Sequence, residues 1–103
     1  MPWVLLFAAG LLEIVWAYAM KEAQGFTRLP FVLLMIVAMM GSFGLLALAM
    51  RSLPLGTSYM IWTGIGAVGA FVVGILMLGE AVTAQRIVAA FLLIAGMITM
   101  RLS

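Results

Sequence analysis

Charged side chains are almost absent from four long stretches of this sequence, and this absence limits the possible folds more than any other feature. The chain has 103 residues, of which 68% are hydrophobic and 8% are charged, whereas a soluble domain is nearer to 45–50% apolar and 25% charged. A helix needs about 20 apolar residues to cross a hydrocarbon core of about 30 Å. We therefore predict an all-α integral membrane protein with four transmembrane helices and no room for a soluble domain.

Proline, glycine and charged residues mark the expected ends of these helices. We expect one four-helix transmembrane domain over residues 1–103, with helices at about 2–20, 29–50, 58–78 and 87–101. Thr27 and Thr83 stand where side chains cap the second and fourth helices. The fourth range is short for a full span, so we expect it to borrow residues from the preceding loop or to lie where the bilayer thins.

Glu13 is the one charged residue that falls inside a predicted span, while the other seven lie in loops or at chain ends. A charge at the bilayer centre costs roughly 2.5–3.5 kcal/mol on insertion scales, and such residues usually face a bundle interior or a water-filled cavity and serve a function. Gly10 and Trp16 lie three residues away on the same helix face. This stripe indicates a close helix contact beside a small polar pocket. A purely structural role for Glu13 is the alternative, but no intramembrane cation exists to pair with it.

Four further residues are predicted to lie at a similar depth, in the middle third of the membrane. Trp16 is one turn from Glu13, Ser42 lies roughly 13 Å from the second loop, and Tyr59 shares a face with Trp62. Aromatic faces attract cations, a carboxylate supplies the opposite charge, and hydroxyl groups supply hydrogen bonds. We interpret the set as a site for an organic cation. The alternatives are ordinary membrane aromatics and a Ser42 hydroxyl bonded to its own helix backbone.

Several functional classes are excluded by what the sequence lacks. There is no cysteine and no histidine, so neither a metal site nor a cofactor is expected. No basic stripe suggests a nucleic acid partner, and no P-loop suggests ATP hydrolysis. A proton and a cation that exclude each other at Glu13 are sufficient for exchange, provided that the site opens to one side at a time. We expect a transporter and not an enzyme.

The third predicted helix is unusually rich in glycine. Gly66, Ala70 and Gly74 form a row of small residues four apart, which permits close approach of helix backbones. Gly64 and Gly66 also weaken the helix locally, which is common where helices bend. Plain packing and a moving hinge both remain open, because the pattern itself does not distinguish them.

Positive charges are almost evenly divided between the two ends of the predicted bundle. Arg51 and Arg101 belong to one end, and Lys21, Arg28 and Arg86 belong to the other. The positive-inside rule therefore gives almost no preferred orientation. Two oppositely inserted copies could pair as an antiparallel homodimer with a pseudo-two-fold axis in the membrane plane, which is the logic of inverted-repeat transporters. A single topology fixed by one charge is the alternative.

Five motifs that together span nearly the whole chain carry a family resemblance. They are Gly10-x-x-Glu13-x-x-Trp16-Ala17, Gly25-Phe26-Thr27-Arg28-Leu29, Leu53-Pro54-x-Gly56-Thr57-x-Tyr59, Ile61-Trp62-Thr63-Gly64-Ile65-Gly66 and Gly79-Glu80. With them the sequence resembles the small multidrug resistance family, and most closely its guanidinium exporter subtype. The resemblance implies a dual-topology antiparallel homodimer in the cell inner (plasma) membrane that exchanges protons for cations.

The resemblance also implies a role for particular residues. Glu13 would bind both the proton and the substrate, and the pocket would be lined by Trp16, Ser42, Tyr59 and Trp62, with Gly10 and Thr63 beside it. Gly64 and Gly66 would mark the bend in the third helix. The fourth helix would form the main dimer contact through Ala89 and Gly96, where alanine departs from the more usual glycine.

Trp16 favours guanidinium as the substrate class, because the multidrug branch of the family tends to have a small residue there. A tryptophan one turn from Glu13 narrows the pocket, and a planar guanidinium matches a carboxylate with two parallel hydrogen bonds. The alternative is a proton-coupled exporter of quaternary ammonium or aromatic cations. A passive channel and a non-transporting membrane scaffold are the remaining hypotheses.

Overall fold

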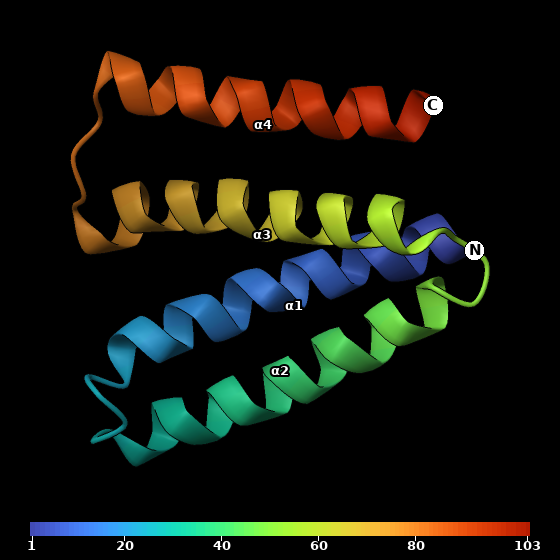
Figure 1. The fold of residues 1–103 in the computed structure, drawn as a ribbon. Helices are drawn as coiled ribbons and strands as arrows, with labels where there is room; N and C mark the ends of the chain where they lie inside the picture. The colour runs from blue at the N-terminus through green and yellow to red at the C-terminus, as the bar shows by residue number, and fades with distance from the viewer.

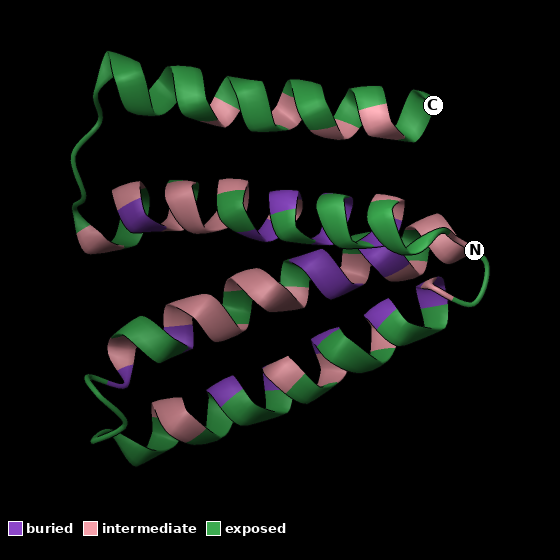
Figure 2. Ribbon diagram, in the orientation of Figure 1, coloured by how far each residue is buried: buried purple, intermediate pink, exposed green.

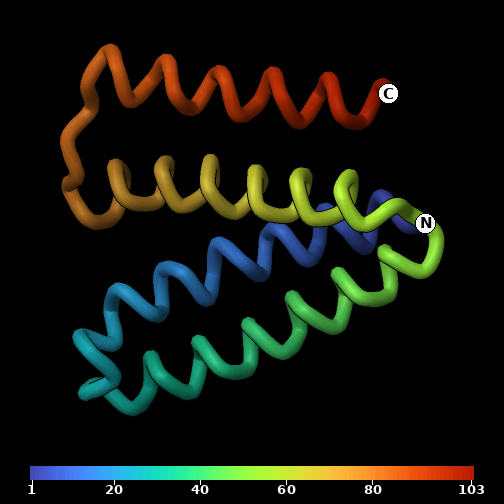
Figure 3. Tube along the Cα trace, viewed as in Figure 1, coloured from blue at the N-terminus to red at the C-terminus, as the bar shows by residue number.

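The computed structural model describes all 103 residues, and it consists of four helices in an up-and-down order (Figure 1). The helices are α1 (Pro2–Glu22), α2 (Leu29–Ala49), α3 (Leu55–Leu78) and α4 (Ala84–Leu102). Each is long and apolar enough to cross a membrane. The prediction of an all-helical protein with four helices able to span a membrane is confirmed. Both chain ends and the α2–α3 loop lie at one end of the bundle (Figure 3).

Two helices begin about three residues earlier than the sequence suggested. Pro54 lies in extended backbone (φ −61°, ψ 153°) and α3 begins directly after it at Leu55, because proline fixes φ and stands well at a helix boundary. α4 begins at Ala84 because the Thr83 hydroxyl accepts a hydrogen bond from the Arg86 backbone N–H at 3.1 Å. The expected Thr83 cap is thus confirmed, and α4 gains its length from the preceding loop.

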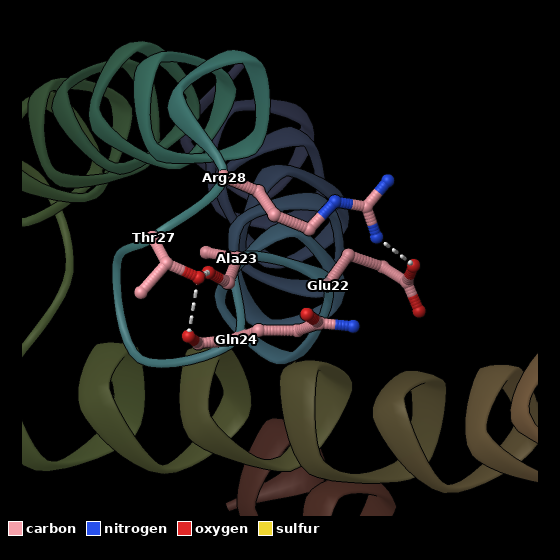
Figure 4. Close-up of polar contacts among 5 residues, drawn as sticks. All are labelled: Glu22, Ala23, Gln24, Thr27 and Arg28. Carbon is pink, nitrogen blue, oxygen red and sulfur yellow. Dashed lines mark hydrogen bonds and ion pairs between the residues drawn. The ribbon is translucent and has the colours of Figure 1, made fainter.

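The loop between α1 and α2 folds back onto the end of α1 (Figure 4). Residues 24–26 all have positive φ, between 48° and 72°, which turns the chain sharply. The Thr27 hydroxyl consequently donates to the Gln24 carbonyl at 2.8 Å, and Arg28 takes the N-cap position of α2 without any side-chain cap. The prediction that Thr27 caps α2 was wrong, because its hydroxyl bonds backwards. Arg28 Nη1 also lies 3.4 Å from Glu22 Oε2.

The core is built from three of the four helices. α1 packs against both α2 and α3, whereas α4 packs mainly against α3 (Figure 1). α4 touches α1 at one end, where the Arg101 guanidinium lies 4.9 Å from the centre of the Trp3 ring. The buried core residues are Leu6, Ala9, Leu46, Ala49, Ile61 and Trp62. No residue of α4 is buried (Figure 2), although its Met97 side chain fits closely against Gly64 of α3. The fold of one chain therefore rests on α1, α2 and α3.

Glycines allow α1 and α3 to approach closely. A Cβ atom placed on Gly10 of α1 would lie 2.6 Å from Cγ2 of Ile65 on α3. In the opposite direction, a Cβ atom on Gly69 of α3 would overlap the Ile14 side chain of α1. Each helix thus fits a branched side chain against a glycine of the other, which is the usual way for membrane helices to gain contact area.

We expect Gly69→Ala to destabilise the folded protein by about 1–3 kcal/mol, the usual range for an overpacked core. The matched control is Gly44→Ala on α2, where an added Cβ meets nothing within 4 Å. This control should be neutral or slightly stabilising, since alanine favours a helix over glycine. The measurement is reversible unfolding by dodecyl sulfate in mild detergent, followed by circular dichroism. Equal stability of the two variants would contradict the close α1–α3 contact.

Candidate functional site

A buried chain of hydrogen bonds joins the three core helices at one depth. The Trp62 indole N–H on α3 donates to the Ser42 hydroxyl of α2 at 2.9 Å. The Ser42 hydroxyl donates in turn to the Ala9 backbone carbonyl of α1 at 2.6 Å. Ser42 is fully buried and Trp62 nearly so. The Ser42 hydroxyl therefore bonds the backbone of α1 and not that of its own helix, and it fixes the orientation of the Trp62 ring.

Four aromatic rings form a continuous row beside these hydrogen bonds. Trp16 meets Phe43 edge to face, with ring centroids 6.4 Å apart. Phe43 lies 5.8 Å from Trp62, and Trp62 lies 5.4 Å from Tyr59. Such separations are typical of favourable aromatic pairs. The row crosses from α1 over α2 to α3 and offers several ring faces to a cation.

Phe43 is the member of this row that the sequence did not single out. It follows Ser42 directly, so on an ideal helix its side chain points about 100° away from the Ser42 side chain. No polar group marks it among the other apolar residues of α2. Its contact with both Trp16 and Trp62 arises from the rotation of α2 about its own axis, which is a tertiary property.

Glu13 lies half-buried on the α1 face that meets α3. A Cβ atom placed on Gly66 would overlap its carboxyl group, so the carboxyl group rests directly on the glycine backbone. Its Oε1 atom is buried and has no hydrogen-bond partner, and the same holds for the Trp16 indole N–H one turn along α1. The only ion pair of the chain is Arg28–Glu22. A buried carboxyl oxygen and a buried indole N–H therefore remain available to a ligand.

The other predicted site residues occupy different faces of the bundle. Gly10 packs against Ile65, whereas Thr63 is exposed and lines a cavity of about 400 Å³ between α3 and α4. Tyr59 and Gly64 line the same cavity, and Gly96 lines it from α4. Helix α3 is unbroken through residues 64–66. Ala89 of α4 is exposed and lines another cavity of about 240 Å³ between α3 and α4.

The three core helices bring together a carboxyl oxygen without a hydrogen-bond partner, a row of aromatic rings and several small residues. No group of three histidine, cysteine, aspartate or glutamate residues that could hold a metal ion is present. The chemistry on offer is therefore reversible binding by charge, hydrogen bonds and aromatic faces.

Comparison with known proteins adds two findings. A family model described as Small Multidrug Resistance protein matches residues 1–94. Proteins named guanidinium exporter from Citrobacter freundii and Salmonella typhimurium are each 50% identical to this chain over 103 residues, which is 100% of this chain and 98% of each relative. A guanidinium exporter of Yersinia pseudotuberculosis serotype I is 48% identical over 103 residues, 100% of this chain and 99% of the relative.

We expect Ser42→Ala to cost about 1–3 kcal/mol of folding free energy, because the Trp62 indole N–H is then left buried without an acceptor. Ser58→Ala is the matched control, since Ser58 is equally buried but its hydroxyl has no hydrogen-bond partner. The control should be neutral or stabilising. Both are measured by dodecyl sulfate unfolding in mild detergent. A Ser42→Ala protein as stable as the Ser58→Ala protein would show that the hydrogen-bonded chain contributes nothing.

Proposed function

The chain belongs to the small multidrug resistance family, and from this we propose that it exports guanidinium or a small substituted guanidinium in exchange for protons. The observation that carries the proposal is the buried Glu13 Oε1 atom without a partner, one turn from the unpartnered Trp16 indole. Relatives named guanidinium exporter that match the full length of the chain support the choice of substrate.

Guanidinium fits this site by shape as well as by charge. Its planar fork of N–H groups can donate two parallel hydrogen bonds to one carboxylate. In this proposal the Trp16 and Trp62 rings stack on the flat cation, because cation–π attraction strengthens where water is excluded. Trp16 also limits the space beside Glu13. A small planar ion is therefore favoured over a bulky one.

Coupling to protons follows from the single carboxyl group. A cation is attracted to Glu13 only when the group is ionised, and a proton removes that charge. The two ligands thus compete for one site, and each is carried only in the absence of the other. Alternating exposure of this site to the two sides of the membrane would turn the competition into exchange.

We further propose that two oppositely inserted copies form an antiparallel homodimer in the inner (plasma) membrane, each copy a single four-helix domain. The two-fold axis then lies in the membrane plane, so that rotation about it relates the state open to one side to the state open to the other side. The unburied surface of α4 supports this assembly. Ala89 and Gly96, the positions proposed for the dimer contact, line cavities on the side of α4 that faces α3. Gly64 and Gly66 are the positions at which we expect α3 to bend during the exchange.

Export of bulkier quaternary ammonium or aromatic cations is the second candidate. The aromatic row favours it, because the exposed Phe43 and Tyr59 rings extend the row beyond the two tryptophans. Displacement of guanidinium from reconstituted protein by a large aromatic quaternary ammonium would favour this second candidate over the first.

We expect Glu13→Gln to abolish guanidinium-dependent currents on solid-supported membranes, because glutamine can neither bind a proton nor attract a cation. Glu22→Gln is the control, since it removes an acid that lies at the end of α1 and pairs only with Arg28. It should keep full currents. Size-exclusion chromatography verifies that both variants are folded. Guanidinium-dependent transport by the Glu13→Gln protein would sink the mechanism.

We also expect guanidinium binding to weaken as the pH falls. Where Glu13 is mostly protonated, one proton must leave for each cation bound, so the Kd should rise about tenfold per pH unit. Tryptophan fluorescence titrations in detergent at several pH values measure the slope. A Kd that does not change with pH would mean that proton and cation bind at separate places.

A further inference from the structure

A second cavity, of about 310 Å³, lies between the C-terminal halves of α1 and α3. It begins at Ile14 and Ala17, within one helical turn of Glu13, and it reaches Lys21 and Glu80 at the helix ends. The distance along α1 from Glu13 to Lys21 is about 12 Å at 1.5 Å per residue. The cavity therefore occupies the depth between the buried carboxyl group and the loop end of the bundle.

The α3 wall of this cavity combines Ala67, Ala70 and Gly74 with the larger Phe71, Val73 and Leu78. Glu80 lines its outer end, and Glu13 directly precedes Ile14, which lines its inner end. The Glu13 carboxyl group rests on Gly66, and the Glu80 carboxyl group rests on Gly74, two turns further along the same row. Gly79 ends α3 in the left-handed conformation (φ 69°), and the Glu80 backbone N–H donates to the Gly74 carbonyl at 3.0 Å. This turn brings Glu80 back over α3 and into the cavity lining.

Glu80 is not neutralised by a neighbour. Lys21 lines the cavity from α1. The only ion pair of the chain is Arg28–Glu22, so Lys21 and Glu80 do not form an ion pair. The remaining polar side chain in the lining is Tyr18. Most of the lining is apolar, but Tyr18, Lys21 and Glu80 supply polar groups toward the loop end of the cavity. Water molecules, which occupy about 30 Å³ each in the liquid, have room in the cavity and can bond to these groups.

We propose that this cavity is the water-filled path by which a small organic cation passes between Glu13 and the end of the bundle that holds the α1–α2 and α3–α4 loops. Glu80 is the outer carboxylate of the path and raises the cation concentration at its mouth, as negative clefts do for their counter-ions. Lys21 on the opposite wall weakens that attraction, so that a cation passes and is not trapped. The identity of the cation rests on the proposed function, whereas the path itself does not.

The path is tested by cysteine labelling, for which the absence of native cysteine provides a clean background. Ala70→Cys places a thiol in the cavity, and Val72→Cys, two residues along α3 on an exposed face, is its control. In proteoliposomes, membrane-impermeant methanethiosulfonates should modify Ala70→Cys at least tenfold faster than Val72→Cys. The cationic reagent should react several-fold faster than the anionic one, and Glu80→Gln should remove that preference.

Equal labelling of the two cysteines would overturn the path, and a charge preference unchanged by Glu80→Gln would overturn the role of Glu80. Transport gives a second readout. At low ionic strength Glu80→Gln should raise the KM for guanidinium several-fold with kcat unchanged, and Lys21→Gln should lower the KM. An unchanged KM in the Glu80→Gln protein contradicts the entrance role. A wild-type protein that shows the labelling pattern but no guanidinium current would refute the proposed function and leave the path standing.

Discussion

The contact between the Glu13 carboxyl group and the Gly66 backbone sets how the remaining helices are arranged. Gly66 has no Cβ atom at the point where the Glu13 carboxyl group meets α3, and a Cβ atom there would overlap that group. The same close approach places Ile14 against Gly69 and Ile65 against Gly10. With α1 held this close to α3, the α2 helix packs on the other side of α1. The buried acid and the packing of the bundle therefore depend on the same small residues.

The hydrogen bonds through Ser42 add rigidity where the glycines give only proximity. Ser42 links a side chain of α3 to the backbone of α1, so all three core helices are tied at the depth of the aromatic row. Because the Ser42 hydroxyl already donates to Ala9, it acts on a ligand through the position of Trp62. The unpartnered atoms beside it belong to Glu13 and Trp16. Hydrogen bonds thus fix the position of Trp62, whereas the Glu13 carboxyl oxygen and the Trp16 indole N–H have no hydrogen-bond partner.

Much of this structure was predictable from the apolar runs and the positions of the charges. The four helices, the Thr83 cap and the family resemblance are all confirmed. Sequence position gives depth in the membrane reliably, because the rise per residue is constant. It does not give the rotation of each helix about its axis, which is why Phe43 and the Ser42–Ala9 bond were missed. The backward turn at residues 24–26, which redirects Thr27, likewise depends on backbone conformations that residues other than glycine seldom adopt.

The light attachment of α4 has a consequence for how such a protein can diverge. Its side chains are absent from the buried core, and Glu13, Ser42 and the aromatic row all come from the other three helices. Under the proposed function, changes on the face of α4 that points away from α3 leave the cation-binding residues unaltered. Duplicated copies of one gene could then diverge in the partner with which they dimerise while they keep the same substrate. In the proposed assignment, the residues for dimerisation and the residues for cation binding lie on separate helices and can change independently.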